Sequence, residues 1–319
     1  KLTNTLFTVA VAALSLTACG TKNTNADLEI ENKVEALLGK MTLEEKLGQM
    51  NQLSPWDFDE LAGKVRKGEV GSILNYTDSA LVNKIQRVAV EESRLGIPLL
   101  VSRDVIHGYK TIFPIPLGQA ATFNPQIVER GARVAAVEAS ADGIRWTFAP
   151  MIDISRDPRW GRIAESCGED PYLTSVMGTA MIKGFQGSLL NSPTSMAACA
   201  KHFAVHSGPE GMRHYFNAEV SKKDLYETYL PAFKACVQEA KVEAVMGAYN
   251  RTNGEPCCGS KTLLKDILRD EWGFEGHVTS DCWAIKDFYE GHNVTKNAEE
   301  SVALAMNNGC DLNCGTLFV

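Results

Sequence analysis

Side chains that can act as nucleophiles, proton carriers or hydrogen-bonding groups follow several short apolar runs of the sequence. They are Asp104, Asp153, Lys201 with His202, Tyr249 with Asn250, Asp281 and Asp311. Carboxylate, imidazole and ammonium groups carry most acid–base and nucleophilic chemistry in enzymes. The end of a strand also needs polar groups that meet water, and this alternative explains any single one of them. Six such positions together favour an active site where strand ends converge.

The apolar runs are predicted to be strands, and longer segments with a helical apolar repeat lie between them. Strands are expected at residues 71–74, 98–102, 146–149, 197–200, 244–247, 276–279 and 310–312. Helices are expected at residues 81–94, 125–142, 172–186, 222–239, 262–270 and 298–307. This alternation predicts an α/β fold in which parallel strands close into a TIM-type (β/α)8 barrel. The polar residues that follow the strands would then meet on one rim.

One more helix is predicted near the start of the barrel. Thr42 and Glu45 have the spacing of a capping box, which begins a helix that runs through Met50. Leu43, Leu47 and Met50 are expected on its apolar face.

The composition is that of an ordinary globular protein with one large core. Apolar residues make up 45% and charged residues 22% of the 319 residues. The formal charge of −7 and the lack of a Lys/Arg cluster exclude a nucleic-acid partner, because phosphate binding needs concentrated positive charge. The sequence contains no zinc-like cysteine pairs, no H-E-x-x-H motif and no phosphate-binding loop motif. We therefore predict neither a metal ion nor another cofactor.

The N-terminus resembles a bacterial lipoprotein signal. An apolar stretch at residues 6–16 is too short to span a bilayer, and small residues precede Cys19. We expect a signal peptide at residues 1–19, lipid on Cys19 and a tether at residues 20–36, followed by the barrel at residues 37–319. The protein would then be exported as a periplasmic or outer-membrane lipoprotein that meets the membrane only through this anchor. An ordinary secretory signal is the alternative.

Four motifs resemble those of family 3 glycoside hydrolases, in the order that this family has them. They are DPRWGR at residues 157–162, GEDP at 168–171, KHF at 201–203 and VTSDCWAI at 278–285. The resemblance implies the N-terminal barrel of a retaining β-glycosidase. It also implies that Asp281 is the nucleophile, which attacks the sugar and forms a glycosyl-enzyme. Without the resemblance, Asp281 is explained equally well as the N-cap of a following helix.

The resemblance assigns further residues to the sugar site. Asp104 would accept hydrogen bonds from hydroxyls far from the scissile bond, and Tyr249 would support Asp281. The other predicted ligands are Arg162, Lys201, His202, Arg213 and Trp283. Arg162, Lys201 and His202 are also expected to hold the pKa of Asp281 down. Core packing is the alternative for Trp283, because Cys282 stands where other members carry tryptophan. A Schiff-base lysine is the alternative for Lys201, and His206, His214 and Glu210 are expected to be loop residues.

The first half of the chain resembles β-glucosidases of the family and the second half resembles its β-xylosidases. SRDVIHG at residues 102–108 and FPIPL at 113–117 are typical of the former, and SGPE at 207–210 and DLNCG at 311–315 of the latter. By the same resemblance, a disulfide between Cys282 and Cys314 is expected at the rim of the site. Asp104 favours a glucosyl substrate and the disulfide a xylosyl one.

A retaining glycosidase also needs an acid/base carboxyl group about 5 to 5.5 Å from the nucleophile. In the family this glutamate comes from a following α/β sandwich domain, so we expect a C-terminally truncated barrel that lacks its acid/base. Glu165, Glu169 and Glu210 are candidates within the chain, but none matches the motif of the family's donor. The chain by itself is then expected to be a weak or inactive glycosidase. A sugar-binding or unstable fragment is the alternative of another class.

Overall fold

The computed structural model describes residues 25–55, 57–207 and 213–318. The predicted signal peptide, Cys19 and Glu210 lie outside these residues. The chain divides into a first unit, residues 1–41, and a second unit, residues 42–319. Helix α1 (Asn25–Leu38) lies in the first unit and occupies much of the range that was expected to be a tether.

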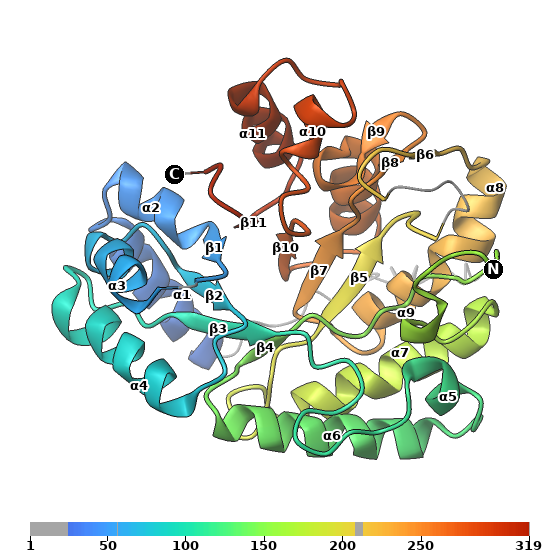
Figure 1. The fold of residues 1–319 in the computed structure, drawn as a ribbon, viewed down its shortest axis with the longest axis horizontal. Coiled ribbons are helices and arrows are strands. Elements are labelled where there is room, and N and C mark those ends of the chain that lie inside the picture. Colours follow the sequence, from blue (N-terminus) through green and yellow to red (C-terminus); the bar gives the residue numbers. More distant parts are fainter. Residues whose placement is uncertain (1–24, 56, 208–212, 319) are drawn as a thin grey trace, which may run out of the picture. The chain divides into compact units, whose positions relative to one another are not determined.

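The described residues of the second unit include eight parallel strands that follow one another as a ring (Figure 1). Five form a sheet in the order β11 (Asn313–Cys314), β1 (Asn51–Leu53), β2 (Ser72–Leu74), β3 (Leu100–Arg103) and β4 (Trp146–Thr147). Three form a second sheet in the order β10 (His277–Thr279), β7 (Ala244–Gly247) and β5 (Cys199–Phe203). Parallel bridges join the sheets at both edges. Two lie at one edge, from Trp146 to Ala197 and from Met151 to Lys201, and one lies at the other, from Thr279 to Leu312.

Helices connect the strands of the ring. They are α2 (Leu43–Gln49), α3 (Phe58–Lys67), α4 (Ser79–Arg87) with η1 (Val88–Glu92), α5 (Pro116–Ala120), α6 (Pro125–Ala141), η2 (Ile163–Glu165), α7 (Pro171–Gln186), α8 (Lys222–Asp224) with η3 (Leu225–Tyr229), α9 (Pro231–Gln238), η4 (Cys257–Gly259), η5 (Lys261–Glu271), α10 (Asp287–Glu290) and α11 (Ala298–Asn307). A small separate sheet consists of β6 (Asn217–Ala218), β8 (Arg251–Thr252) and β9 (Glu255–Pro256). The mixed α/β architecture with parallel strands is the one that the sequence predicts.

Side chains alternate between two apolar cores along the strands, as the two-residue period of a strand requires. On β7, Ala244 and Met246 belong to a small cluster with residues of β2, β4, β5 and β11, whereas Val245 belongs to the large cluster that includes the helices. Phe185 of α7 and Phe233 of α9 are among the largest fully buried side chains. The ring is therefore packed on its inside and beneath its helices.

Two local predictions are wrong in detail. The capping box of Thr42 and Glu45 is present, but Leu43 is 66% exposed, and Glu45 is buried instead because it pairs with Arg94. The single helix expected at residues 222–239 is divided at Leu230, because Pro231 has no N–H group to continue the helix. Among the described residues, no helix combines the length and the apolarity that crossing a bilayer requires.

Candidate active site

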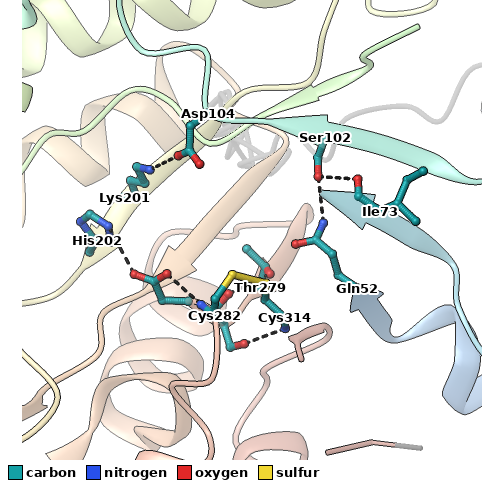
Figure 2. Close-up of a disulfide and its surroundings, with 11 residues drawn as sticks. Gln52, Ile73, Ser102, Asp104, Lys201, His202, Thr279, Cys282 and Cys314 are labelled. Atoms are coloured by element: carbon teal, nitrogen blue, oxygen red, sulfur yellow. Dashed lines mark hydrogen bonds and ion pairs between the residues drawn. A yellow bond between two sulfur atoms is a disulfide. The ribbon is translucent and has the colours of Figure 1, made fainter. Parts of the chain in front are cut away.

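The carboxyl end of β5 brings two consecutive polar side chains to the site. The pairing of β5 with β7 shifts register between Lys201 and Phe203, and such an irregularity changes the direction of the side chains that follow it. Nζ of Lys201 lies 2.6 Å from Oδ1 of Asp104, which follows β3 (Figure 2). The Lys201 side chain is only 5% exposed and that of Asp104 is 46% exposed. The ion pair therefore has one buried partner and one partner that contacts solvent.

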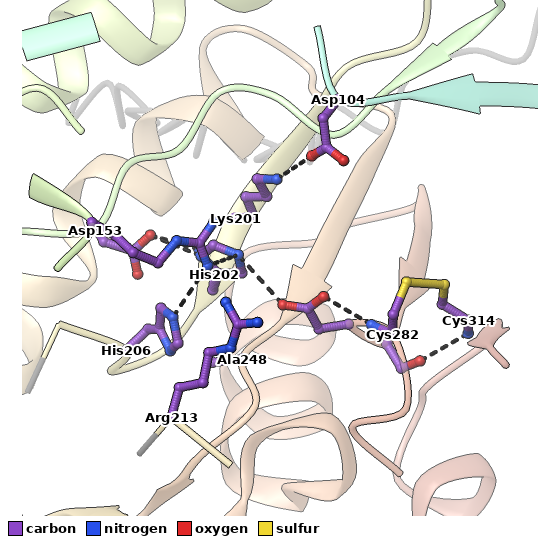
Figure 3. A network of polar contacts seen from close by, with 12 residues as sticks. Asp104, Asp153, Lys201, His202, His206, Arg213, Ala248, Cys282 and Cys314 are labelled. Atoms are coloured by element: carbon purple, nitrogen blue, oxygen red, sulfur yellow. Dashed lines mark hydrogen bonds and ion pairs between the residues drawn. A yellow bond between two sulfur atoms is a disulfide. The ribbon is translucent and has the colours of Figure 1, made fainter. Parts of the chain in front are cut away.

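His202, the next residue, lies between two buried carboxylates (Figure 3). Its Nδ1 is 3.0 Å from Oδ2 of Asp153, and its backbone N–H donates to the same oxygen at 3.1 Å. Its Nε2 is 3.5 Å from Oδ2 of Asp281. Burial, reinforced by the charge of Arg162, lowers the pKa of His202 well below its ordinary value, so the ring is neutral at pH 7.

Asp281 follows β10 and is held by two donors. The backbone N–H of Cys282 donates to its Oδ1 at 2.8 Å, and the hydroxyl of the buried Tyr249 also donates to this carboxylate. Burial raises the pKa of Asp281 above its ordinary value, although Lys201, the Cys282 N–H group, Tyr249 and Arg162 oppose the rise. Lys201 and Arg162 lower this pKa as expected, but the expected net lowering is wrong, because burial outweighs them.

Arg162 connects these residues to a glutamate. Its Nε and Nη2 each donate to an oxygen of Glu165 at 2.8 Å, which is the two-bond geometry of a strong Arg–carboxylate pair. Its Nη1 lies 3.2 Å from Nε2 of His202 and 3.5 Å from Nε2 of His206. The hydrogen bonds from Arg162 lower the pKa of Glu165, so this carboxyl group is ionised at neutral pH.

His206 lies in the loop that follows β5, as expected, and this loop buries it in the site. It is 2% exposed, its ring lies 4.5 Å from that of His202, and its Nδ1 lies 3.3 Å from Oδ1 of Asn250. Burial lowers its pKa to about 3. The sequence gives no sign of this burial, because residues 204–206 have neither a helical nor a strand-like apolar repeat.

A disulfide joins Cys282 to Cys314, with their Cα atoms 4.5 Å apart (Figure 2). It ties the residue after Asp281 to β11. The backbone N–H of the adjoining Trp283 donates to the carbonyl of Cys314 at 2.8 Å, and 48% of the surface of Trp283 is exposed. Core packing, the alternative for Trp283, is therefore wrong. Trp283 and the disulfide line one side of a cavity of about 470 Å³.

Arg213 reaches the same site from the chain beyond β5. Figure 3 shows its side chain pointing toward the group of His202 and His206, and its guanidinium lies 5.0 Å from the centre of the Tyr249 ring. The next residue, His214, pairs through Nδ1 with Oδ2 of Asp287 at 2.7 Å. Arg213 is thus placed where it can contact a molecule bound over Tyr249.

Asp311 is not at this rim. It precedes β11, and its Oδ2 accepts hydrogen bonds from Arg269 at 2.8 Å and from the backbone N–H of Val278 at 2.7 Å. Its strand begins three residues later than the predicted one, and this shift moves Asp311 toward the amino ends of β10 and β11. Glu169 is exposed and precedes α7.

The fold and the site define a class of protein. Parallel strands that alternate with helices carry carboxylates, a lysine and neutral histidines at their carboxyl ends, which is the arrangement of an α/β-barrel with a polar small-molecule site. The model of the "Glycosyl hydrolase family 3 N terminal domain" matches residues 42–315. The chain belongs to this family.

Relatives of known name agree with this assignment. The chain is 42% identical over 282 residues to a periplasmic beta-glucosidase of Salmonella typhimurium, covering 88% of this chain and 37% of that protein. It is 42% identical over 293 residues to a xylan 1,4-beta-xylosidase of Xylanibacter ruminicola, covering 84% of this chain and 34% of that protein. A beta-glucosidase from Listeria innocua in complex with isofagomine superposes with a TM-score of 0.84 at 41% identity, over 90% of this chain and 41% of that one. The chain thus spans about a third of the curated relatives that it matches.

Proposed function

We propose that the protein to which this chain belongs hydrolyses terminal β-D-glucosyl residues of oligosaccharides through a covalent glycosyl-enzyme on Asp281. The observation that carries the proposal is the setting of Asp281. This carboxylate lies at the end of a barrel strand, is held by the Cys282 N–H group and the Tyr249 hydroxyl, and faces a neutral histidine.

In the proposed reaction a carboxylate oxygen of Asp281 forms a bond to the anomeric carbon while the bond to the leaving oxygen breaks. Water then attacks the same carbon and releases Asp281, so the configuration is retained. Asp104 and Lys201 would bind hydroxyls at the half-exposed side, and Arg162 and Arg213 would bind hydroxyls nearer the scissile bond. The ring nitrogens of His202 face Asp153 and Arg162, so His202 would orient Arg162 rather than bind a hydroxyl itself. Trp283 would form a wall of the site.

The acid/base is proposed to come from a further α/β sandwich domain of the whole protein. Within the described residues, Glu165 is a poor proton donor because its pair with Arg162 lowers its pKa. Glu169 is exposed to solvent. The curated relatives are about two and a half times as long as the chain, which leaves room for such a domain.

A β-xylosidase is the second candidate, and the disulfide favours it. Cys282 and Cys314 hold β10 and β11 together beside Asp281, where they would narrow the space for the hydroxymethyl group of glucose. The similarity to the xylosidase of Xylanibacter ruminicola is as high as that to the glucosidase of Salmonella typhimurium. The half-exposed Asp104 favours the glucosyl substrate.

Export to the periplasm, with a lipid on Cys19, is also part of the proposal. The Salmonella relative is named periplasmic, and a disulfide persists in an oxidising compartment. Incorporation of radiolabelled palmitate into the expressed protein, and its loss in Cys19→Ser, tests the anchor.

The proposed reaction is tested with 2-deoxy-2-fluoro glucosyl and xylosyl fluorides, whose leaving group departs without an acid. Intact mass should increase by one sugar residue, and the faster probe identifies the preferred sugar. A folded chain that gains no mass from either probe contradicts the proposal.

A further inference from the structure

The hydrogen bonds around Arg162 determine where two histidine rings carry their protons. A guanidinium only donates hydrogen bonds. Nη1 of Arg162 has two hydrogens, and its two ring neighbours are Nε2 of His202 at 3.2 Å and Nε2 of His206 at 3.5 Å. Nε and Nη2 are directed to Glu165. Both Nε2 atoms must therefore accept, and an accepting ring nitrogen has no hydrogen.

The opposite nitrogen of each ring meets an acceptor. Oδ2 of Asp153 accepts the backbone N–H of His202 at 3.1 Å and lies 3.0 Å from its Nδ1, which therefore carries the ring hydrogen. On the other ring, Nδ1 of His206 lies 3.3 Å from Oδ1 of Asn250. The side-chain nitrogen of Asn250 donates to the carbonyls of Val205 and Arg251, both at 2.7 Å, so its oxygen is free to accept.

The position of the hydrogen on His202 matters for Asp281. Nε2 of His202 lies 3.5 Å from Oδ2 of Asp281. With a hydrogen on Nε2, the ring would donate to this oxygen and stabilise the carboxylate before it attacks. Stabilisation of the ground state alone slows the chemical step. With the hydrogen on Nδ1, the oxygen receives nothing from this ring.

We propose that Asp153 and Asn250 are positioning residues that hold His202 and His206 with the hydrogen on Nδ1, so that Arg162 is oriented by both rings and the attacking carboxylate receives no hydrogen bond from His202. The proposal rests on the proposed role of Asp281. The lowered pKa of both rings agrees with it, because neither ring then carries a second hydrogen at pH 7.

Nitrogen-15 NMR of the 319-residue chain reads the tautomers directly, because protonated and bare ring nitrogens have different chemical shifts. The resonances are assigned from His202→Gln and His206→Gln variants. We expect a hydrogen on Nδ1 and none on Nε2 for both residues at pH 7. A hydrogen on Nε2 of His202 overturns the proposal, whether or not Asp281 is the nucleophile.

Labelling by 2-deoxy-2-fluoroglucosyl fluoride tests the positioning role. Asp153→Leu removes the acceptor, so the limiting rate of labelling should fall by about 10²- to 10⁴-fold and the His202 tautomer should change. Asp153→Asn can still present an oxygen to both N–H groups and should keep the wild-type tautomer and most of the rate. His277→Gln, which changes a partly buried histidine at the start of β10, is the control and should leave both unchanged.

Three outcomes contradict the proposal. They are a wild-type rate in Asp153→Leu, a rate in Asp153→Asn as low as that in Asp153→Leu, and an unchanged tautomer in a slow Asp153→Leu variant. If Asp153→Leu does not fold, the labelling rate of Asp153→Asn and the tautomer of His202 in the wild type still test the proposal. If the wild-type chain is not labelled at all, the proposed function is contradicted, and the tautomers measured by NMR still test the proposal of this subsection.

Discussion

Two groups of buried polar side chains, on two sides of the strand ring, differ in how they are paired. Around β5, β7 and β10, the buried side chains of Lys201, His202, His206 and Asp281 all have polar partners. Around β11, β1 and β2, buried polar atoms of Asn51, Gln52, Ser72 and Asn313 have no partner among the described residues. An unpaired buried polar group destabilises a protein by about 1–3 kcal/mol. Pairing, rather than burial, thus distinguishes these four side chains of the proposed site, although Ser207 and His277 nearby also have buried atoms without a partner among the described residues.

The largest expected effect is that of Asp281→Asn. It should reduce covalent labelling by at least about 10⁴-fold, because the attacking oxygen is lost. It should also raise the melting temperature at pH 7. The pKa of Asp281 is raised in the folded state, so folding favours the protonated form, and this contribution to stability is lost as the pH rises through the folded pKa.

Calorimetry of Asp281→Asn at pH 7 and at pH 3 checks this sign. The gain in melting temperature should shrink at the lower pH, where the wild-type carboxyl is protonated in both states. A variant that is less stable than the wild type at pH 7 would show that burial of the ionised Asp281 carboxylate does not destabilise the folded protein.

Lys201→Met should have the next largest effect. It leaves the half-exposed Asp104 without its partner and removes the positive charge that most strongly opposes the raised pKa of Asp281. We expect labelling to slow by about 10²-fold. As the pH is lowered, the labelling rate of the wild type should begin to fall above pH 3.8, the ordinary pKa of aspartate. In the variant this fall should begin at a higher pH than in the wild type.

The pH profile of the labelling rate measures both effects. Lys261→Met is the matched control, because Lys261 forms an exposed ion pair with Asp266 at 2.5 Å. An acidic limb that stays in place in Lys201→Met contradicts the assigned coupling between Lys201 and Asp281.

Loss of the disulfide should affect stability more than chemistry. Cys282 and Cys314 are 32 residues apart and cross the seam where one bridge joins β10 to β11. The double variant Cys282→Ser with Cys314→Ser should lower the free energy of unfolding by about 3 kcal/mol. Urea unfolding with and without reductant checks this. The reductant should destabilise the wild type and leave the double variant unchanged, and equal sensitivity of both would contradict it.

The smallest expected effect belongs to the other side of the ring. Ser72→Ala removes an unpartnered buried hydroxyl and should change the free energy of unfolding by less than about 1 kcal/mol, in the stabilising direction. Ser102→Ala is the matched variant on the next strand. The Ser102 hydroxyl accepts from Gln52 at 3.0 Å and donates to the Ile73 carbonyl at 2.9 Å, so its loss should destabilise by about 1–2 kcal/mol. Equal effects in urea unfolding would remove the distinction between paired and unpaired groups.

Apolar strands and strongly periodic helices could be predicted from the sequence. β7 and α11 begin and end at the predicted residues, because a buried apolar run and a regular helical repeat are local signals. β1 was missed because two of its three residues, Asn51 and Gln52, are polar and nevertheless buried. Burial of this kind depends on neighbouring strands, which a local pattern does not contain.

The site was predicted less completely than the fold. The family motifs predicted that Asp281, Lys201, His202 and Arg162 belong to one site, and the structure places them within one network. His206 and Asn250 were not assigned roles, since their function depends on which nitrogen faces Arg162. That orientation is a property of tertiary contacts.

The assignment of Asp281 as the nucleophile is tested most directly by peptide mapping of the chain after labelling with the fluorinated glycosyl probes. We expect one adduct, on Asp281 in the peptide that contains the Cys282 to Cys314 disulfide, and none on Asp104 or Asp153. An adduct on either of those carboxylates, or none on a folded chain, would contradict the assignment.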